Sequence, residues 1–388
     1  MRDAAAWVGS PENFTHTRVE SLFSEGLVSS KVNLEKAIFA LEYVAQLQET
    51  GLDFMFKGGS AVQILLGDRW NRLSVDVDIC TDASEEELRE ALEVIKRKFE
   101  GGGFTYSARR DEILGTVPFL SFRVMTPPIT ERGRVILLDA MGLKPRLATR
   151  TTPLKSFYYD SPVAVTTPTI GAILGDKLST IGPNTVGRAM RDSRNGLEYA
   201  KHFYDINHLS YAEPDSEECA NAYSESVDIQ SRIRRRDFTV DECVEDSIFS
   251  CQVASLPQTL HADAFERLNP DEKGRARTEY EILRKGLRGF QPFLVKGVSY
   301  TWDQLREYAS RTALLTKAMT MELSPNTVRG VLSLAPPASR EEIRALWSDI
   351  KALRLPDRQL WFIDPVEILN FPMVLRNWHS FYTIVLKK

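Results

Sequence analysis

Two aspartates interrupt a short apolar segment of the sequence. Asp76 and Asp78 are two residues apart and alternate with Val75, Val77 and Ile79. If this segment is a β-strand, both carboxylates lie on one face and the three apolar side chains lie on the other. The carboxylates would then be about 6–7 Å apart along the strand, at roughly 3.3 Å per residue. Such a pair can converge on a hard cation, and it therefore predicts a site for Mg²⁺ or Mn²⁺.

A pair of glycines precedes the aspartates. Gly58 and Gly59 follow a short apolar run, residues 54–56, and Lys57. Glycine permits a tight turn and lets a ligand approach the backbone, because it has no Cβ. The apolar segment that begins at Ser60 predicts a short helix, whose free N–H groups and positive dipole end suit a phosphate. We therefore expect a phosphate-binding turn beside the metal site.

Each half of this pattern has a simpler interpretation. A Gly-Gly pair is often only a turn, and an Asp-x-Asp strand is often the solvated outer face of a sheet. The combination is harder to explain in this way, because half-buried paired carboxylates are costly without a cation or hydrogen bonds. A phosphate cradle beside a divalent metal is what phosphoryl or nucleotidyl transfer requires.

These residues resemble the signature of the nucleotidyltransferase superfamily, whose fold is that of DNA polymerase β. The particular form here resembles the AbiEii/AbiGii nucleotidyltransferase toxin family, and it consists of Lys57-Gly58-Gly59-Ser60 followed by Arg72, Ser74, Asp76 and Asp78. A second block, at residues 170–178, 182–187 and 201–206, resembles the family's Gly-Asp-Lys-Leu helix, its Pro-Asn-Thr loop and its Tyr-Asp-Ile helix. The resemblance covers roughly residues 30–210, and His202 stands where many members carry a polar amide.

The resemblance implies a reaction and roles for the first block. The reaction is Mg²⁺-dependent transfer of a nucleoside monophosphate from an NTP to an acceptor, with release of pyrophosphate. Asp76 and Asp78 would hold the metal ions, and the turn from Lys57 to Ser60 would bind the phosphates of the NTP. Ser74, beside the metal site, would contact the triphosphate or itself be modified.

Three more charged residues are candidates through the same resemblance. Lys177 would stabilise the charge that develops in the transition state, although a lone lysine on a helix is usually a surface residue. Asp205 would pair with Lys177 or act as a general base for the acceptor hydroxyl. Asp139, within the apolar strand predicted at residues 134–141, is either a third metal ligand or a strand-end acid that faces solvent.

The elements that position these residues change in character along the chain. Residues 31–50 have the apolar spacing of an amphipathic helix, and Ser84 with Glu87 predicts a capping box at the start of another. Strands are expected at residues 104–108, 117–125 and 134–141, and a basic connector at 144–155. We therefore predict an α/β (α+β) fold. Residues 1–165 would form a nucleotidyltransferase domain with a small mixed sheet flanked by helices, and residues 166–388 a mainly helical domain that completes the active site.

Composition limits the class of protein. The 388 residues are 43% hydrophobic and 26% charged, as expected for a soluble globular chain. The four cysteines have no CxxC spacing and the five histidines are scattered, which argues against zinc and disulfide frameworks. A net charge of −4 gives no general attraction to nucleic acid, so any RNA contact requires local basic patches. The sequence has no segment typical of a signal peptide or membrane span, and we expect a cytoplasmic protein.

The expected biological setting follows from the resemblance. It implies the toxin of a bacterial toxin–antitoxin or phage-defence pair, with a separate antitoxin protein as partner and the tRNA 3′ end as one possible acceptor. One alternative is a non-catalytic, NTP-binding regulatory protein, against which the presence of Lys57, both aspartates and Lys177 argues. The other is a nucleotidyltransferase that modifies a protein or small-molecule hydroxyl, which the acidic pI favours slightly.

Overall fold

The structure is a computed structural model that describes residues 6–67, 70–99, 103–114, 116–260, 264–295, 297–321, 323 and 325–386. The chain forms two compact units. The first, which we call the α/β unit, comprises Met1–Ile173, Ile229–Arg236 and Gln291–Ser299. The second, the helical unit, comprises Leu174–Asp228, Asp237–Phe290 and Tyr300–Lys388. The predicted class, a small mixed sheet flanked by helices and followed by a mainly helical region, is confirmed.

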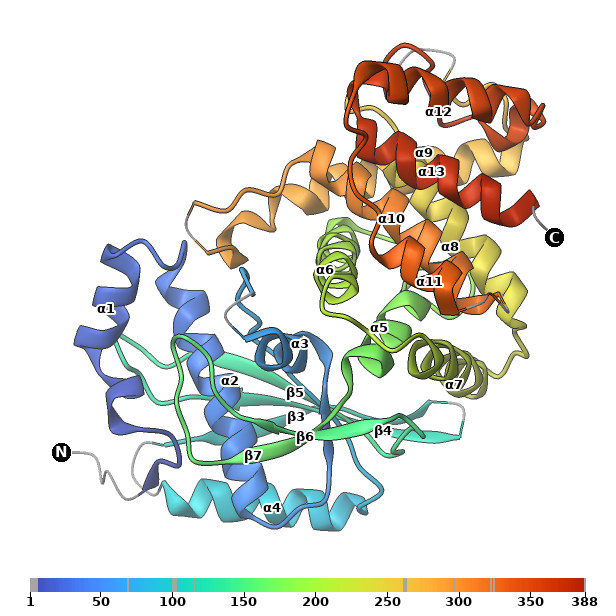
Figure 1. The fold of residues 1–388 in the computed structure, drawn as a ribbon. Coiled ribbons are helices and arrows are strands. Elements are labelled where there is room, and N and C mark those ends of the chain that lie inside the picture. The colour runs from blue at the N-terminus through green and yellow to red at the C-terminus, as the bar shows by residue number, and fades with distance from the viewer. Residues whose placement is uncertain are drawn as a thin grey trace. The chain divides into compact units, whose positions relative to one another are not determined.

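A five-stranded mixed sheet forms the centre of the α/β unit (Figure 1). The strand order is β1 (Met55–Lys57), β2 (Val77–Cys80), β5 (Val135–Met141), β4 (Val117–Met125) and β3 (Thr105–Leu114). The pairing of β2 with β5 is parallel, whereas the other pairs are antiparallel. Because β2 has β1 on one side and β5 on the other, it is an inner strand, and the side chains of both neighbours flank its own.

Helix α2 (Lys31–Glu49) lies against the sheet between α1 (His16–Ser24) and α4 (Glu85–Lys98). Its apolar spacing predicts one buried face, but every residue from 37 to 47 is buried. The helix can be buried all round because distant parts of the chain satisfy its polar side chains. The hydroxyl of Tyr159 and the backbone N–H of Gly9 both donate to Glu42, and burial raises the pKa of this carboxyl.

Helix α4 begins as its sequence predicts. The hydroxyl of Ser84 accepts from the backbone N–H of Glu87, and the Glu87 side chain accepts from the backbone N–H of Ser84. Two free donors at the helix start are thereby satisfied, which is the function of a capping box.

The basic connector predicted at residues 144–155 contains a strand. β6 (Thr149–Pro153) pairs antiparallel with β7 (Ala164–Pro168) in a separate two-stranded sheet, and β7 packs against β1. The hydroxyls of Thr152 and Thr167 are hydrogen-bonded at 2.7 Å in the interior of this hairpin. The strand was not predicted because threonine and arginine lack the apolar alternation that marks a half-buried strand.

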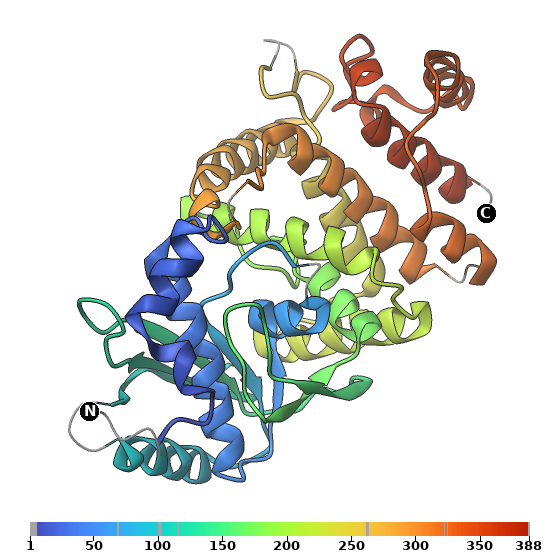
Figure 2. The same cartoon turned by 60° about the vertical axis from the view of Figure 1, so that its left-hand side comes forward.

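Long helices make up the helical unit, whose core helices are α6 (Ser193–Ser210), α8 (Val240–Ala254), α9 (Pro270–Arg288) and α10 (Trp302–Thr320) (Figures 1 and 2). Helices α6 and α9 cross at a contact between two glycines. A Cβ at Gly196 would overlap the carbonyl of Ile282, and a Cβ at Gly286 would overlap the backbone of Gly196. The two backbones therefore meet directly.

The remaining elements extend this unit towards the C-terminus. Helix α10 also packs against α13 (Pro372–Leu386), and α13 against α12 (Arg340–Ala352). The structure also includes α5 (Ile170–Ser179), α7 (Ser216–Arg234) and α11 (Pro325–Leu332). Among the helices that the structure describes, none combines the length and apolarity needed to cross a membrane.

We predict that Glu35→Ala lowers the free energy of unfolding by about 3–5 kcal/mol, the scale of breaking a buried ion pair. Glu35 is fully buried on α2, and its carboxylate accepts from Arg134 Nε at 3.0 Å and Nη2 at 3.2 Å. The substitution leaves the Arg134 guanidinium without its partner. Urea unfolding measures the change, and Glu49→Ala, an exposed glutamate at the end of the same helix, is the control. Equal effects of the two substitutions would contradict the prediction.

Candidate active site

The two aspartates lie at the inner strand β2. Asp78 is within the strand and Asp76 directly precedes it, because β2 begins at Val77 and not at residue 75 as predicted. Val75, Val77 and Ile79 are 8%, 0% and 2% exposed, whereas both aspartates are half-buried. The predicted alternation is therefore present, with both carboxylates on the more open face of the strand.

The glycine pair forms the first residues of helix α3 (Gly58–Leu66), not a separate turn before it. Gly58 has a φ of +74°, in the region that favours glycine, and a Cβ there would overlap the Asp78 carboxylate. A Cβ at Gly59 would lie 2.6 Å from Ser74 Oγ and 2.7 Å from Arg72 Nη2. The start of α3 thus lies directly against one of the two aspartates.

Hydrogen bonds tie β1, α3 and the segment before β2 together. Lys57 is the cross-strand partner of Asp78 in the β1–β2 pair. The hydroxyl of Ser60 donates to the backbone carbonyl of Asp76 at 2.6 Å. The structure therefore brings together all the residues that the sequence predicts for the first block, which are Lys57, Gly58, Gly59, Ser60, Ser74, Asp76 and Asp78.

Two polar side chains beside this group were not predicted as site residues. Arg72 is 3% exposed, lies over the ring of Trp70 at 5.1 Å, and donates from Nη1 to the carbonyl of Leu73 at 3.1 Å. Gln63 is 2% exposed, and its Oε1 accepts from the backbone N–H of Ser74 at 3.1 Å. A signal was available for both residues: Gln63 interrupts the apolar run of residues 61–66, and Arg72 belongs to the motif that carries the family resemblance.

Asp139 lies on the neighbouring strand β5. It is the register partner of Asp78 in the parallel β2–β5 pair. Its carboxylate accepts from the hydroxyl of Ser121, and Arg109 Nη1 is 3.9 Å from Oδ1. Among the described residues, no three His, Cys, Asp or Glu side chains are grouped closely enough to hold a metal ion. Asp139 is therefore next to Asp78 in the sheet but is engaged by other partners.

The residues present fit the metal that the resemblance implies. Mg²⁺ is commonly held by one or two carboxylates and completes its shell with water and substrate phosphates. Asp78 on β2 and Asp76 directly before it supply two half-buried carboxylates. Gly58 has no Cβ, so the Asp78 carboxylate lies directly against the start of α3. Two carboxylates beside a helix start suited to phosphate match this mode of Mg²⁺ binding.

The second block of predicted residues lies in the helical unit. Lys177 on α5 and Asp205 on α6 form an ion pair, with Nζ 3.1 Å from Oδ2. Lys177 is 6% exposed and Asp205 is fully buried. Because burying charge is costly unless it is paired, each of these side chains depends on the other.

His202 lies one turn before Asp205 on α6. Burial, followed by the positive charge of Lys177, lowers the pKa of His202 to about 3, although Glu198 and Asp205 act in the opposite direction. Its Nδ1 is buried and has no hydrogen-bond partner among the described residues. The imidazole is therefore neutral at physiological pH.

The Gly-Pro-Asn-Thr loop at residues 182–185 is held by an acid that was not predicted. Asp246 on α8 accepts from the backbone N–H of Asn184 at 2.8 Å and from that of Thr185 at 2.9 Å. It also pairs with Arg275 on α9 at 2.6 Å. This network fixes the loop that follows the helix of Lys177.

Gly58→Ala should lower the free energy of unfolding by at least about 1 kcal/mol more than Gly51→Ala. Both glycines have positive φ, +74° and +79°, so alanine is strained at either position. No atom lies within 4 Å of a Cβ at Gly51, whereas one at Gly58 overlaps Asp78. Forcing a methyl group into a packed site costs about 1–3 kcal/mol. Denaturant unfolding of both variants tests this, and equal losses would show that Asp78 does not approach Gly58.

His202 should contribute stability that is lost as the pH falls. In an unfolded chain its pKa is about 6.5, and in the folded chain it is about 3. Below pH 6.5 the unfolded state therefore binds a proton that folded His202 does not, which favours unfolding. Relative to His202→Gln, the wild-type chain should lose about 2 kcal/mol between pH 7.5 and pH 5, at 1.36 kcal/mol per pH unit below 6.5.

NMR of the histidine side chains measures the same property directly. Of the five histidines, the one whose signal disappears in His202→Gln should show no change of chemical shift between pH 8 and pH 5. A titration of this signal near pH 6.5 would contradict the buried, neutral state.

Comparison with known proteins identifies the family. A family model described as "Nucleotidyl transferase AbiEii toxin, Type IV TA system" matches residues 40–305. The matched segment contains the start of α3, both aspartates and the Lys177–Asp205 pair. No curated protein matches the chain. Because the family model covers more than half of the sequence, the chain belongs to the AbiEii family of nucleotidyl transferase toxins, which are part of type IV toxin–antitoxin systems.

Proposed function

We propose that this nucleotidyl transferase moves a nucleoside monophosphate from an NTP to a hydroxyl of an RNA acceptor, and that the 3′ end of a tRNA is the first candidate. The acceptor hydroxyl gives up its proton to solvent water, its oxygen forms a bond to the α-phosphorus of the NTP, and the bond from that phosphorus to pyrophosphate breaks. The observation that supports this proposal most is the close approach of Gly58 to Asp78. It sets a helix start suited to phosphate against a strand suited to a divalent metal.

In the α/β unit, the proposed roles follow from position. Asp76 and Asp78 would hold Mg²⁺, and the bound ion would neutralise part of the negative charge of the triphosphate. The backbone N–H groups at the start of α3 bind phosphate oxygens. The Arg72 guanidinium lies beside Gly59 and adds a fork of donors that matches a phosphate. Ser74 Oγ, on the same side of Gly59, is a further donor to the triphosphate.

Asp139 is proposed as a third ligand of the same metal site. Its position across from Asp78 in the β2–β5 pair supports this role. The contacts with Ser121 and Arg109 would hold the carboxylate in one orientation when the substrate is absent.

In the helical unit, Lys177 is proposed to neutralise the negative charge of the reacting phosphates. The Asp205 carboxylate holds the ammonium group in place. The neutral His202 beside the pair adds no competing charge. The proposal that Lys177 and the two aspartates serve one reaction is supported by the family match, which includes both blocks. Because Lys177 and Asp205 follow residue 165, we propose that residues 1–165 alone are inactive and that residues 166–388 complete the site.

The type IV toxin–antitoxin setting supports a cognate antitoxin as the protein partner. Transfer to a hydroxyl of a protein or a small molecule is the alternative for the acceptor. The two acceptor classes differ in the product, because the label from an NTP enters RNA in one case and protein or a small molecule in the other.

We predict that Asp76→Asn lowers the rate of transfer by about 100-fold or more, the scale of losing one electrostatic stabiliser of a transition state. The full chain is incubated with each α-labelled NTP, Mg²⁺ and total RNA, and the label is separated into RNA, protein and small molecules. Asp53→Asn is the matched control, because the Asp53 side chain is 87% exposed and lies two residues before β1.

The transfer rates of the other variants and the fraction that takes up the label decide between the possible results of this experiment. Lys177→Ala should lower transfer to a similar degree, whereas Asp53→Asn should leave it unchanged. Label in protein but not in RNA would replace the RNA acceptor with the alternative. Absence of label from all three fractions, or full activity of Asp76→Asn, would overturn the proposed function.

A further inference from the structure

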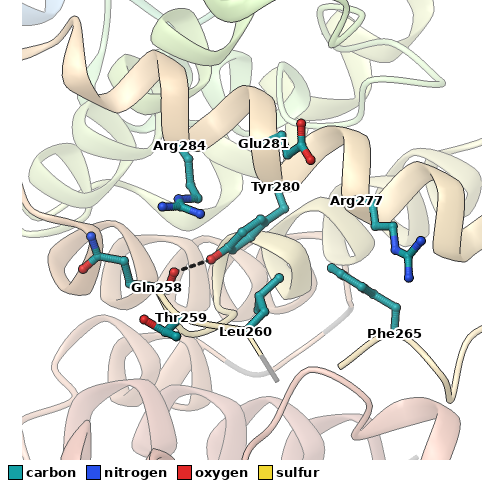
Figure 3. Close-up of a pocket in the computed structure, with 8 residues that line it drawn as sticks. All are labelled: Gln258, Thr259, Leu260, Phe265, Arg277, Tyr280, Glu281 and Arg284. Atoms are coloured by element: carbon teal, nitrogen blue, oxygen red, sulfur yellow. Dashed lines mark hydrogen bonds between the residues drawn. The ribbon is translucent and has the colours of Figure 1, made fainter. Parts of the chain in front are cut away.

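A pocket of about 570 Å³ lies in the helical unit, away in sequence from all the predicted site residues. It is formed by one face of α9, by residues 258–260 and by Phe265 (Figure 3). Its lining residues are Gln258, Thr259, Leu260, Phe265, Arg277, Tyr280, Glu281 and Arg284. A volume of this size is within the range of small-molecule sites in proteins.

The pocket carries an unbalanced positive charge. Among the described residues, neither Arg277 nor Arg284 forms an ion pair, whereas Arg275 on the same helix pairs with both Asp246 and Glu279 at 2.6 Å. The carboxylate of Glu281, the acid of the pocket, lies 3.9 Å from Lys285, which is outside the lining. Two guanidinium groups without protein carboxylates are available to an anionic ligand.

Aromatic rings hold both guanidinium groups in position. Arg284 lies over the ring of Tyr280 and Arg277 over the ring of Phe265, each with Cζ 5.6 Å from the ring centre. The Tyr280 hydroxyl donates to the carbonyls of Pro257 and Gln258, both at 2.7 Å, which anchors the opposite wall to the helix. These contacts reduce the side-chain entropy that a ligand would otherwise have to remove on binding.

The two arginines are spaced for a ligand larger than a single phosphate ion. Seven residues, or about 10 Å of helix axis, separate Arg277 from Arg284. Figure 3 shows the two arginines on either side of Tyr280, with Leu260 opposite the helix. The Glu281 carboxylate points away from the pocket. The wall between the two cations is therefore aromatic and apolar. This arrangement offers forks of donors for a phosphate and a surface on which a flat base can stack.

We propose that this pocket binds a nucleoside 5′-phosphate, either free or at the end of a polynucleotide, at a site separate from the residues assigned to nucleotidyl transfer. One of the two guanidinium groups, that of Arg277 or Arg284, binds the phosphate, and the other donates to the opposite end of the ligand. The base packs against Leu260 and against the parts of Phe265 and Tyr280 that line the pocket, and the side chains of Gln258 and Thr259 supply hydrogen bonds at the rim. An acidic peptide would satisfy the two cations but would not use the flat apolar wall between them.

Protection of arginines from chemical modification tests the site directly. The full chain is treated with phenylglyoxal in EDTA, with 5′-AMP, adenosine, a 5′-phosphorylated tetraribonucleotide or an octaglutamate peptide present, and modified arginines are mapped by mass spectrometry. We expect 5′-AMP to protect Arg277 and Arg284, and adenosine to protect neither. Arg288 is exposed at the end of the same helix, does not line the pocket, and should be modified equally in all samples.

Substitutions give a second measure. Arg277→Ala with Arg284→Ala should weaken binding of 5′-AMP by at least about tenfold, the scale of losing a charge-assisted hydrogen bond, whereas Arg288→Ala should not change it. The measurement is made on the chain carrying Asp76→Asn and Asp78→Asn, so that its result is independent of metal-dependent binding and of catalysis. If the double variant does not fold, the protection experiment on the unsubstituted chain decides.

Each outcome either supports or overturns the proposal that the pocket binds a nucleoside 5′-phosphate. If 5′-AMP and the tetranucleotide protect the two arginines to the same degree at the same concentration, the ligand is a free nucleotide. Much stronger protection by the tetranucleotide indicates the end of a strand. Absence of protection by both, equal protection by adenosine, equal protection of Arg288, or protection by octaglutamate alone would overturn the proposal. Activity of the enzyme is not measured, so failure here leaves the proposed transferase function intact.

Discussion

The direct approach of Gly58 to Asp78 is the constraint on which the α/β unit depends. Antiparallel pairing places Lys57 opposite Asp78, so the chain must enter α3 at the next residue, against the carboxylate. Only a residue without a Cβ and with access to positive φ satisfies both requirements. The same strand pairs on its other side with β5, so Asp139 lies beside Asp78. The close contact therefore joins the start of α3 to β2, the strand that lies between β1 and β5.

Elsewhere in the molecule, several buried charged side chains are paired with a side chain of opposite charge. Lys177 is buried with Asp205, and Glu35 with Arg134. Arg275 pairs with both Asp246 and Glu279. Burial raises the pKa of Glu279, and the positive charge of Arg275 acts in the opposite direction. Such pairs add little net stability but make the structure intolerant of losing one partner.

The sequence predicted what depends on local pattern and not what depends on distant partners. The period-two alternation identified β2 and its carboxylates, and the bounds of β4 and the Ser84–Glu87 capping box are confirmed. The burial of α2 on all sides could not be predicted, because the residues that satisfy Glu35 and Glu42 come from other segments. The network around Asp246 joins residues about 60 positions apart, and no spacing in the sequence indicates such a contact. Functional roles within the site stay predictions, whereas family membership rests on the match over residues 40–305.

The glycine contact between α6 and α9 has a mechanical consequence. Because the two backbones touch, no layer of side chains lies between them at this crossing to allow sliding or a change of rotamer. Asp205 is carried on one of these helices, and the arginine-lined pocket on the other. The spacing between the buried carboxylate and the pocket is thus set by the direct contact of two helix backbones.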